Sequence, residues 1–246
     1  MVSPGPIANP LDRLFFMPWV GKRTESIQRL FELMFTNSDN TAADAVIRLL
    51  GGTQNVMRFL SNEGVDGIRI NRTISELLTY YYDLTRSGCC QSGSTNLARS
   101  VGDVLTTVRQ ISPAYACRVD KERCMAESGE DSATPATVSE LLARVSTDPR
   151  FRQVYDQMLR CRTGKQRLQR GLRGFKSNLR RFAHKTGSLG GIANDVGVVE
   201  FSTGYVATLV VMSCRCSATM AARESCIAEV AEVIITDWAE TGAIVR

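Results

Sequence analysis

The stretch HKTGSLGGIANDVGVVEFSTGYVATLVVMSC, residues 184–214, decides the fold class of this chain. Two apolar runs of strand length, residues 194–201 and 205–214, are joined by the short turn STG, a pattern that predicts a β-hairpin. The opening HKTGSLGG holds one lysine, two hydroxyl side chains and three glycines. This composition fits a β-turn, and it also fits a substrate-binding strand edge on which glycine lets the backbone come close.

Helical periodicity surrounds the hairpin. Residues 24–35, 41–50 and 55–62 carry apolar side chains at helical spacing, and Thr134 with Pro135 is typical of a helix start. Asp148 and Pro149 open another helix in the same way, and a final long helix is expected from Ser217. The expected apolar stripe of that final helix is Met220, Ile227, Val230, Ile234 and Trp238. Helices, a strand pair and a covering helix predict an α+β fold.

The length and composition are compatible with a globular chain of one large or two small domains. It has 246 residues, of which 43% are apolar and 22% charged, and its net charge is +5. No apolar run approaches the roughly 20 residues that span a bilayer, so we expect no membrane span. The first ten residues, MVSPGPIANP, lack the basic and apolar regions of a signal peptide.

The cysteines do not predict a metal site. The eight cysteines lack the paired spacings that zinc needs, and the chain has one histidine, so Cys214 and Cys216 are expected to be unligated thiols. A second group lies in one irregular stretch and could form disulfides if the protein is exported: Cys89, Cys90, Cys117 and Cys124. The compartment therefore stays open.

Two short motifs stand out along the chain. Ser38-Asp39-Asn40 lies between two expected helices, and Lys185-Thr186-Gly187 opens the hairpin before the last helix. Alone, each is weak, because Ser-Asp-Asn is also good helix-capping chemistry. Together, in this order and context, they are specific.

This context resembles the class A β-lactamases and related penicillin-recognising serine enzymes, which carry Ser-Asp-Asn and Lys-Thr-Gly motifs. Four stretches carry the resemblance, in the order of the family: MFTNSDNTAADAVIRLLGG, DSATPATVSELLARV, HKTGSLGGIANDVGVV and ATMAARESCIAEVAEVIITDW. It implies a β-lactamase/transpeptidase-like α+β fold, in which an all-helical part adjoins an antiparallel sheet covered by helices. It also implies β-lactam amide hydrolysis through a serine acyl-enzyme, a β-lactam or peptidoglycan-peptide-like small molecule as partner, no cofactor, and a periplasmic or secreted location.

The resemblance assigns roles to the first motif and to one ion pair. Ser38 is expected to relay a proton toward the β-lactam nitrogen, and Asn40 to contact the amide side chain of the substrate. Asp39 is expected to be structural, as the cap of the following helix. Arg72 and Asp131 match the pair that closes the loop beneath the family's pocket, although some sixty residues separate them here.

The second motif is expected to bind the substrate. Lys185 adds positive potential, and Thr186 and Ser188 hydrogen-bond the substrate carboxylate. The backbone N–H of Ser188 is expected to form half of an oxyanion hole. Gly187 leaves room for a substrate that lies along the strand.

The chain departs from the family pattern at the nucleophile. No serine in it is followed three residues later by lysine, so the Ser-x-x-Lys nucleophile is absent. Family spacing puts that motif upstream of Met1. We therefore expect an N-terminally truncated member that lacks the first strands and the nucleophile helix and is inactive alone.

The second departure concerns deacylation. In the simplest alignment of IRINRTISELL, Ile74 takes the place of the family's general base and Leu78 that of the following asparagine. Glu76 is the nearest carboxylate. Without a carboxylate to activate water, an acyl-enzyme is expected to be long-lived.

The predicted organisation has three parts. They are an irregular lead-in at 1–23, a mostly helical part at 24–182 with an insertion at about 78–131 that carries one helix near 97–108, and the sheet strands and terminal helix at 183–246. The basic stretch 160–181, with nine basic residues, is interpreted as solvated surface and not as a nucleic-acid site. His184 is expected to tune or pack beside Lys185. Two alternatives to a β-lactam hydrolase stay open: a non-catalytic β-lactam- or peptidoglycan-binding fragment, and a D-alanyl-D-alanine peptidase-like relative.

Overall fold

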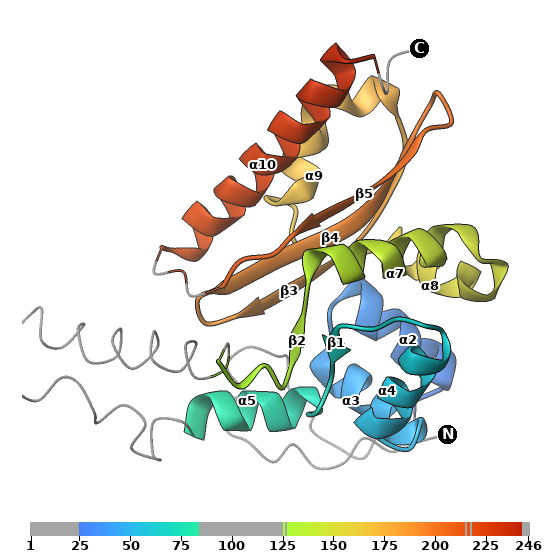
Figure 1. The fold of residues 1–246 in the computed structure, drawn as a ribbon, viewed down its shortest axis with the longest axis vertical. Coiled ribbons are helices and arrows are strands. Elements are labelled where there is room, and N and C mark those ends of the chain that lie inside the picture. Colours follow the sequence, from blue (N-terminus) through green and yellow to red (C-terminus); the bar gives the residue numbers. More distant parts are fainter. Residues whose placement is uncertain (1–24, 84–124, 126, 215, 217, 243–246) are drawn as a thin grey trace, which may run out of the picture.

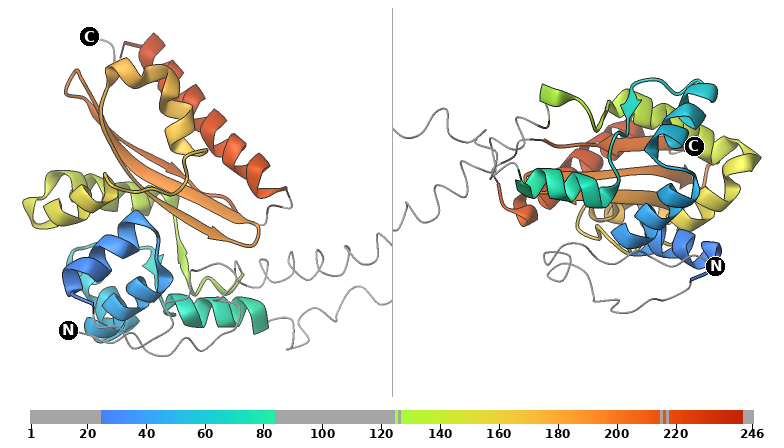
Figure 2. Two further views of the ribbon diagram at one scale, coloured as in Figure 1. Left: turned by 180° about the vertical axis from the view of Figure 1, so that it is seen from behind. Right: turned by 90° about the horizontal axis from the view of Figure 1, so that it is seen from below.

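The computed structural model describes residues 25–83, 125, 127–214, 216 and 218–242 (Figure 1). The expected lead-in, the helix near 97–108 and Cys89, Cys90, Cys117 and Cys124 lie outside these residues. The described chain forms a group of helices beside a three-stranded sheet, and helices lie on both faces of that sheet (Figures 1 and 2). This arrangement is the α+β fold that the sequence predicts.

The helical group is built from the N-terminal elements. Its helices are α2 (Ile27–Thr36), α3 (Asn40–Leu49), α4 (Thr53–Asn62) and α5 (Ile74–Asp83). The N-cap side chains Ser26 and Asp39 accept hydrogen bonds from Arg29 N and Ala42 N, which starts α2 and α3. Gly51 follows the end of α3 with φ of 84°, a left-handed conformation that terminates helices and that glycine adopts freely.

A short two-stranded sheet follows. Strands β1 (Ile68–Arg69) and β2 (Ser132–Ala133) pair antiparallel, although residues 70–131 separate them in the sequence. Next come α7 (Pro135–Thr147), the 3₁₀ helix η1 (Pro149–Phe151) and α8 (Arg152–Met158). Thr134 caps α7 and Pro135 is its first residue, as predicted, because the missing N–H of proline costs nothing at that position.

The main sheet has the order β3-β4-β5 and is antiparallel throughout. Its strands are β3 (Leu179–Leu189), β4 (Ile192–Phe201) and β5 (Val206–Val211). The predicted hairpin is therefore β4–β5. Residues 184–189 of HKTGSLGG are the end of β3, and its last two glycines form the turn to β4. In the β3–β4 register, Lys185 faces Val196 and Thr186 faces Asp195.

Alternation along β4 divides the core into two clusters. Val199 and Phe201 pack with α9 (Leu168–Gly171), the 3₁₀ helix η2 (Leu172–Asn178) and α10 (Met220–Glu240). Val198 faces the other way, toward α7 and α8. Successive strand residues point to opposite faces, so one strand serves both helical layers.

Two sequence expectations need correction. At the predicted start of the insertion, near residue 78, the chain is helical, because α5 continues to Asp83. Thr24 lies outside the described residues and α2 begins at Ile27, whose side chain is 62% exposed. The expected stripe of α10 is also wrong in part, because Met220 and Val230 are exposed. The buried residues of α10 are Arg223, Ile227, Ala228, Ala231 and Ile235.

Candidate functional site

Ser38 occupies an unusual backbone position between α2 and α3. Its φ is 56°, the single positive value among the non-glycine residues that the structure describes. A side chain in this left-handed region costs roughly 1–2 kcal/mol and persists only where the surroundings impose it. The turn is fixed on both sides, since Asp39 N donates to Leu33 O at 3.2 Å and Asp39 Oδ1 accepts from Ala42 N at 2.9 Å. Asn40 follows as the first residue of α3.

The two motifs meet in space. Lys185 Nζ donates to Ser38 Oγ at 2.6 Å across 147 residues of sequence, and to Thr186 O at 2.8 Å. Burial lowers the pKa of Lys185, while the negative groups of Cys161 and Asp195 act in the opposite direction. A half-buried ammonium is thus held between the helical group and the sheet.

The outer end of β3 is open. Gly187 and Ser188 are exposed, and Thr186 Oγ1 lies 2.6 Å from Thr163 Oγ1 on the segment after α8. A Cβ on Gly187 would come no nearer to another residue than 4.0 Å, at Asn194 Cβ. Packing therefore does not demand glycine here, and the space beside this strand end is free for another molecule.

Arg167 is a site residue that sequence reasoning missed. It lies in the basic stretch interpreted as solvated surface, yet it is only 4% exposed. Its guanidinium donates to Gly187 O at 3.1 Å, to Asn194 O at 2.8 Å and to Ser188 Oγ at 2.6 Å, and it pairs with Glu224 at 3.1 Å. A guanidinium is planar and carries five N–H donors, so it can bind several acceptors at once. The regular Arg and Lys spacing of the stretch gave no signal that one member turns inward.

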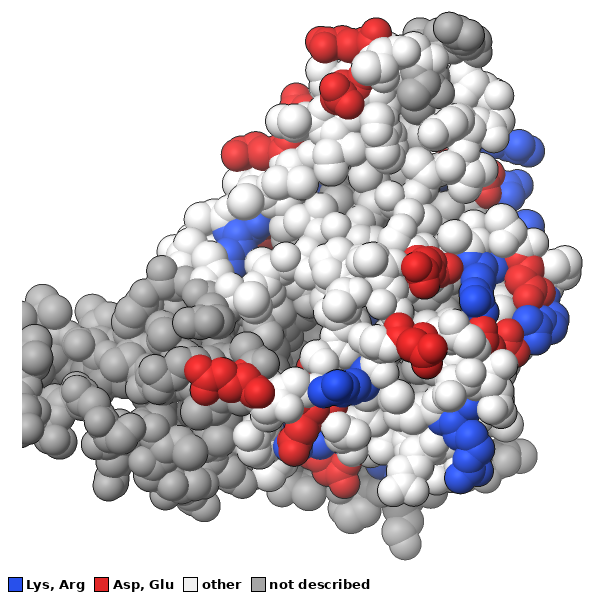
Figure 3. Space-filling model, in the orientation of Figure 1, with Lys and Arg blue, Asp and Glu red and all other residues white. Residues whose placement is uncertain are grey.

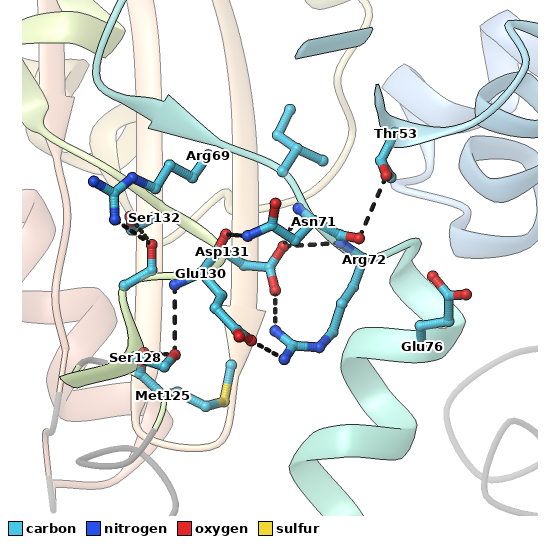
Figure 4. Close-up of polar contacts among 12 residues, drawn as sticks. Thr53, Arg69, Asn71, Arg72, Glu76, Met125, Ser128, Glu130, Asp131 and Ser132 are labelled. Carbon is cyan, nitrogen blue, oxygen red and sulfur yellow. Dashed lines mark hydrogen bonds and ion pairs between the residues drawn. The ribbon is translucent and has the colours of Figure 1, made fainter. Parts of the chain in front are cut away.

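Arg72 and Asp131 form an ion pair, with Nη1 and Oδ2 2.6 Å apart (Figure 4). Asp131 Oδ1 also accepts from Asn71 N at 2.8 Å and from Arg72 N at 3.1 Å, and the guanidinium contacts Glu130 and covers the Tyr80 ring. The pair therefore fastens the start of α5 to β2 across the intervening chain.

The start of α5 is occupied by capping contacts. Glu76 Oε2 accepts from Thr73 N at 2.8 Å and from Thr73 Oγ1 at 2.9 Å, and its side chain is exposed. The buried Asp44 accepts from Ile74 N at 2.6 Å and from Ser75 N at 2.9 Å. Ile74 is half-buried. Glu76 thus has a structural role at a helix N-terminus, where its carboxylate accepts hydrogen bonds from Thr73.

Other kinds of site find little support in the described residues. They contain no cluster of three His, Cys, Asp or Glu side chains suited to hold a metal ion, and Cys161, Cys214, Cys216 and Cys226 are free thiols. In the same residues no helix combines the length and apolarity of a membrane span. On the face drawn in Figure 3, acidic and basic side chains are interspersed and form no broad basic surface.

Comparison with solved structures identifies the fold. A variant of the last common ancestor of Gram-negative class A β-lactamases, bound to 5(6)-nitrobenzotriazole, superposes with a TM-score of 0.63 and 25% identity over 88% of this chain and 66% of its own. The ancestral class A β-lactamase gives a TM-score of 0.62 and 23% identity over 87% and 66% of the two chains. L2 complexed with relebactam gives 0.59 and 23% over 85% and 62%.

The chain spans just under two thirds of these relatives, and no curated protein matches its sequence significantly. One family model, described as the β-lactamase enzyme family, matches residues 20–238. That match covers most of the chain, and the fold is that of the class A enzymes. The chain therefore belongs to the β-lactamase family, with class A enzymes as its structural relatives.

Proposed function

We propose that this chain forms two walls of a β-lactam-binding pocket, one from Ser38–Asn40 and one from the open end of β3. The observation that carries the proposal is the 2.6 Å contact between Lys185 Nζ and Ser38 Oγ, which joins two motifs 147 residues apart. A strained serine, a desolvated ammonium and an open strand edge converge there. This combination is typical of a binding site for an anionic small molecule.

The proposed role of β3 is to hold the carboxylate of the β-lactam. Thr186 and Ser188 offer hydroxyl groups on the strand, and Lys185 supplies the positive charge. Arg167 donates to Ser188 Oγ, so the oxygen is fixed and its own proton is free to point outward. Charge-assisted hydrogen bonds of this kind are about twice as strong as neutral ones. The proposal keeps Asn40 as the contact for the amide side chain.

The proposed reaction class is acyl transfer, the opening of the β-lactam amide through a serine ester. Ser38, activated by Lys185, would pass a proton to the departing nitrogen. The acylating Ser-x-x-Lys is not in this sequence, so hydrolysis and any resistance to β-lactam antibiotics require a nucleophile that these 246 residues do not supply in that motif. The Ser188 N–H stays proposed as one oxyanion donor.

A non-catalytic binding role is the second candidate, and the N-terminus of α5 favours it. Ile74 is aliphatic where the family's deacylating carboxylate is expected, and Glu76 is occupied with Thr73. A protein with these features would bind a β-lactam or a peptidoglycan peptide without turnover. A D-alanyl-D-alanine peptidase-like parent fits the same observation.

Equilibrium binding tests the proposal. The full chain is titrated against a fluorescent penicillin, anisotropy is recorded, and unlabelled benzylpenicillin is added as competitor. We expect saturable binding that Ser188→Ala weakens about tenfold, since one charge-assisted hydrogen bond is worth ~1.5 kcal/mol. Ser202→Ala, in the β4–β5 turn, is the matched control and should leave affinity unchanged.

Intact-mass spectrometry of the same mixtures separates the candidates. A protein that binds penicillin but keeps its unmodified mass supports the non-catalytic binding role. A stable penicilloyl adduct on a serine would overturn the assignment of this chain as lacking a nucleophile. The absence of saturable binding at millimolar ligand would overturn the pocket itself.

A further inference from the structure

A second polar cluster lies in the core, next to Lys185 on β3. His184 Nδ1 is 2.9 Å from Asp195 Oδ1, and the two side chains are 4% and 0% exposed. The other Asp195 oxygen accepts from Leu168 N at 3.2 Å. Phe182 stacks on the imidazole with ring centroids 4.6 Å apart. The carboxylate and the ring therefore hold His184 in one orientation, with Nδ1 committed to Asp195 and Nε2 left for another partner.

That partner is Cys161, on the segment between α8 and α9. Its Sγ lies 3.3 Å from Thr163 Oγ1, and Thr163 Oγ1 in turn lies 2.6 Å from Thr186 Oγ1, on the same face of β3 as His184. The thiol is therefore close enough to His184 for the imidazole to act on its pKa. Gly164 lets this segment lie against β3, because a Cβ there would stand 2.4 Å from Thr186 Cγ2. Cys161 is only half-buried. The imidazole of His184 and the carboxylate of Asp195 are therefore buried, whereas Cys161 is partly exposed to solvent.

The charges around Cys161 favour its thiolate. Burial raises the pKa of the thiol, but the hydrogen bond and charge of His184, aided by Thr163, outweigh it and bring the pKa from 9.0 to about 7. Burial lowers the pKa of His184, and Asp195 and Cys161 together raise it from 6.5 to about 9. The ammonium of Lys185 and the guanidinium of Arg167 are the other charges near this cluster. Near neutral pH a large fraction of Cys161 is thus thiolate, beside an imidazolium.

We propose that Cys161, His184 and Asp195 form a reactive thiol site, at which Cys161 exchanges with low-molecular-weight disulfides. The Cys161 thiolate attacks one sulfur of R–S–S–R, the Cys161–S–S–R bond forms as the original S–S bond breaks, and RS⁻ leaves and takes a proton from water. Cys161 is oxidised and the released half is reduced. His184 stabilises the thiolate, and Asp195 positions His184. The site needs no β-lactam, so it stands apart from the pocket function.

The arrangement is specific to one of the thiols. The chain has a single histidine, and it serves Cys161. Cys226, on α10, is more exposed than Cys161 and is the natural internal reference. If accessibility alone governed reactivity, Cys226 would react first. If the thiolate governs it, Cys161 leads near neutral pH.

The rate of alkylation at each cysteine tests the proposal in the untagged full chain. Iodoacetamide is applied over a pH series, and peptides are quantified after chymotryptic digestion, because trypsin would cut on both sides of Cys161. The Cys161 rate should follow a midpoint near 7, with reactivity present above it and lost below it. Cys226, quantified in the same digests, is the internal reference. Bis(2-hydroxyethyl) disulfide should give the mixed disulfide first at Cys161.

His184→Gln tests the activating partner. The midpoint of Cys161 should rise toward 9. Its rate near neutral pH should fall about sixfold, because a ~50-fold loss of thiolate is partly offset by the higher nucleophilicity of a more basic thiol. Thr163→Val, which removes a single contact of Cys161, should shift the midpoint in the same direction by less, and it serves if His184→Gln does not fold.

The sole imidazole offers a readout that depends on neither variant. Its carbon-bound proton signals in NMR should titrate near 9 in the wild type, and the midpoint should drop in Cys161→Ser but not in Cys226→Ser. The proposal fails if Cys161 and Cys226 share one pH profile, or if Cys161→Ser leaves the His184 titration unchanged. Loss of penicillin binding alone would not affect it.

Discussion

Single residues carry the contact between the two parts of the site. Ser38 reaches Lys185 because its backbone takes a left-handed turn, with φ of 56°. An ordinary backbone at this point would aim the hydroxyl elsewhere. The strain is therefore connected with the position of one oxygen, which is the relation expected between unusual backbone geometry and function.

Two substitutions at Ser38 separate strain from chemistry. Ser38→Gly and Ser38→Ala both remove the hydroxyl, but only glycine adopts the left-handed conformation without cost. We expect the glycine variant to be more stable than the alanine variant by about 0.5–1 kcal/mol, measured by urea unfolding. Penicillin affinity should fall in both. Equal stabilities would show that the turn is not strained.

Residue patterns predicted part of the site. The Ser-Asp-Asn and Lys-Thr-Gly motifs are recognisable because their order and their places beside helices and a hairpin are unusual together. Arg167 was hidden, because a buried arginine looks like its solvated neighbours when the partners lie 20 or more residues away. The Cys161–His184 contact was hidden for the same reason. Local sequence does not encode which side chains a strand edge brings together.

Among the elements, α9 and α10 cross with little space between them at Gly171. A Cβ on Gly171 would lie 2.3 Å from Ala228 O and 2.8 Å from Ala231 Cβ. The buried face of α10 therefore uses small residues where a large apolar stripe was expected. The periodicity identified the helix, but not the face on which another backbone approaches.

Gly171→Ala tests this crossing. The added methyl group meets backbone, so α9 must move, and we expect a loss of about 1–3 kcal/mol in the free energy of unfolding. Gly174→Ala is the matched control, since a Cβ there has no neighbour within 4 Å. Its stability should stay within ~0.5 kcal/mol of wild type. Equal losses at the two positions would contradict the close packing.

Capping and turn chemistry made other elements predictable. Thr134 and Pro135 start α7, and the STG turn joins β4 to β5, because these signals act within a few residues. Strands β1 and β2 escaped prediction. Each is two residues long, and the residues that pair, like the adjacent Arg72 and Asp131, lie some sixty positions apart in the sequence.

At the scale of the whole molecule, one side of the sheet stands out. Among the described residues β5 pairs only with β4, and its outer edge begins with the exposed residues Tyr205 and Val206. An apolar strand edge is a template for pairing with another chain. We expect the protein to self-associate along β5 and to be marginally stable as a monomer. A cooperative unfolding transition well above ~60 °C would count against that marginal stability.

Val206→Lys tests the edge. A charge at an exposed strand edge opposes pairing between copies, so light scattering at a fixed concentration should report smaller particles than wild type. Val233→Lys places the same charge on α10, at a side chain that is 68% exposed. It should leave association unchanged. If both variants reduce association equally, general charge and not the β5 edge is responsible.

We propose that Lys185 serves ligand binding at a cost to the stability of the fold. Its lowered pKa, caused mainly by burial, means that the folded state holds this proton less tightly than the unfolded chain, so the charge lowers stability at neutral pH. The decisive measurement is benzylpenicillin affinity by calorimetry, together with the Tm, for wild type and Lys185→Met. We predict an affinity loss of about tenfold or more, with a Tm unchanged or raised. Unchanged affinity, or a Tm that falls with it, would contradict the account.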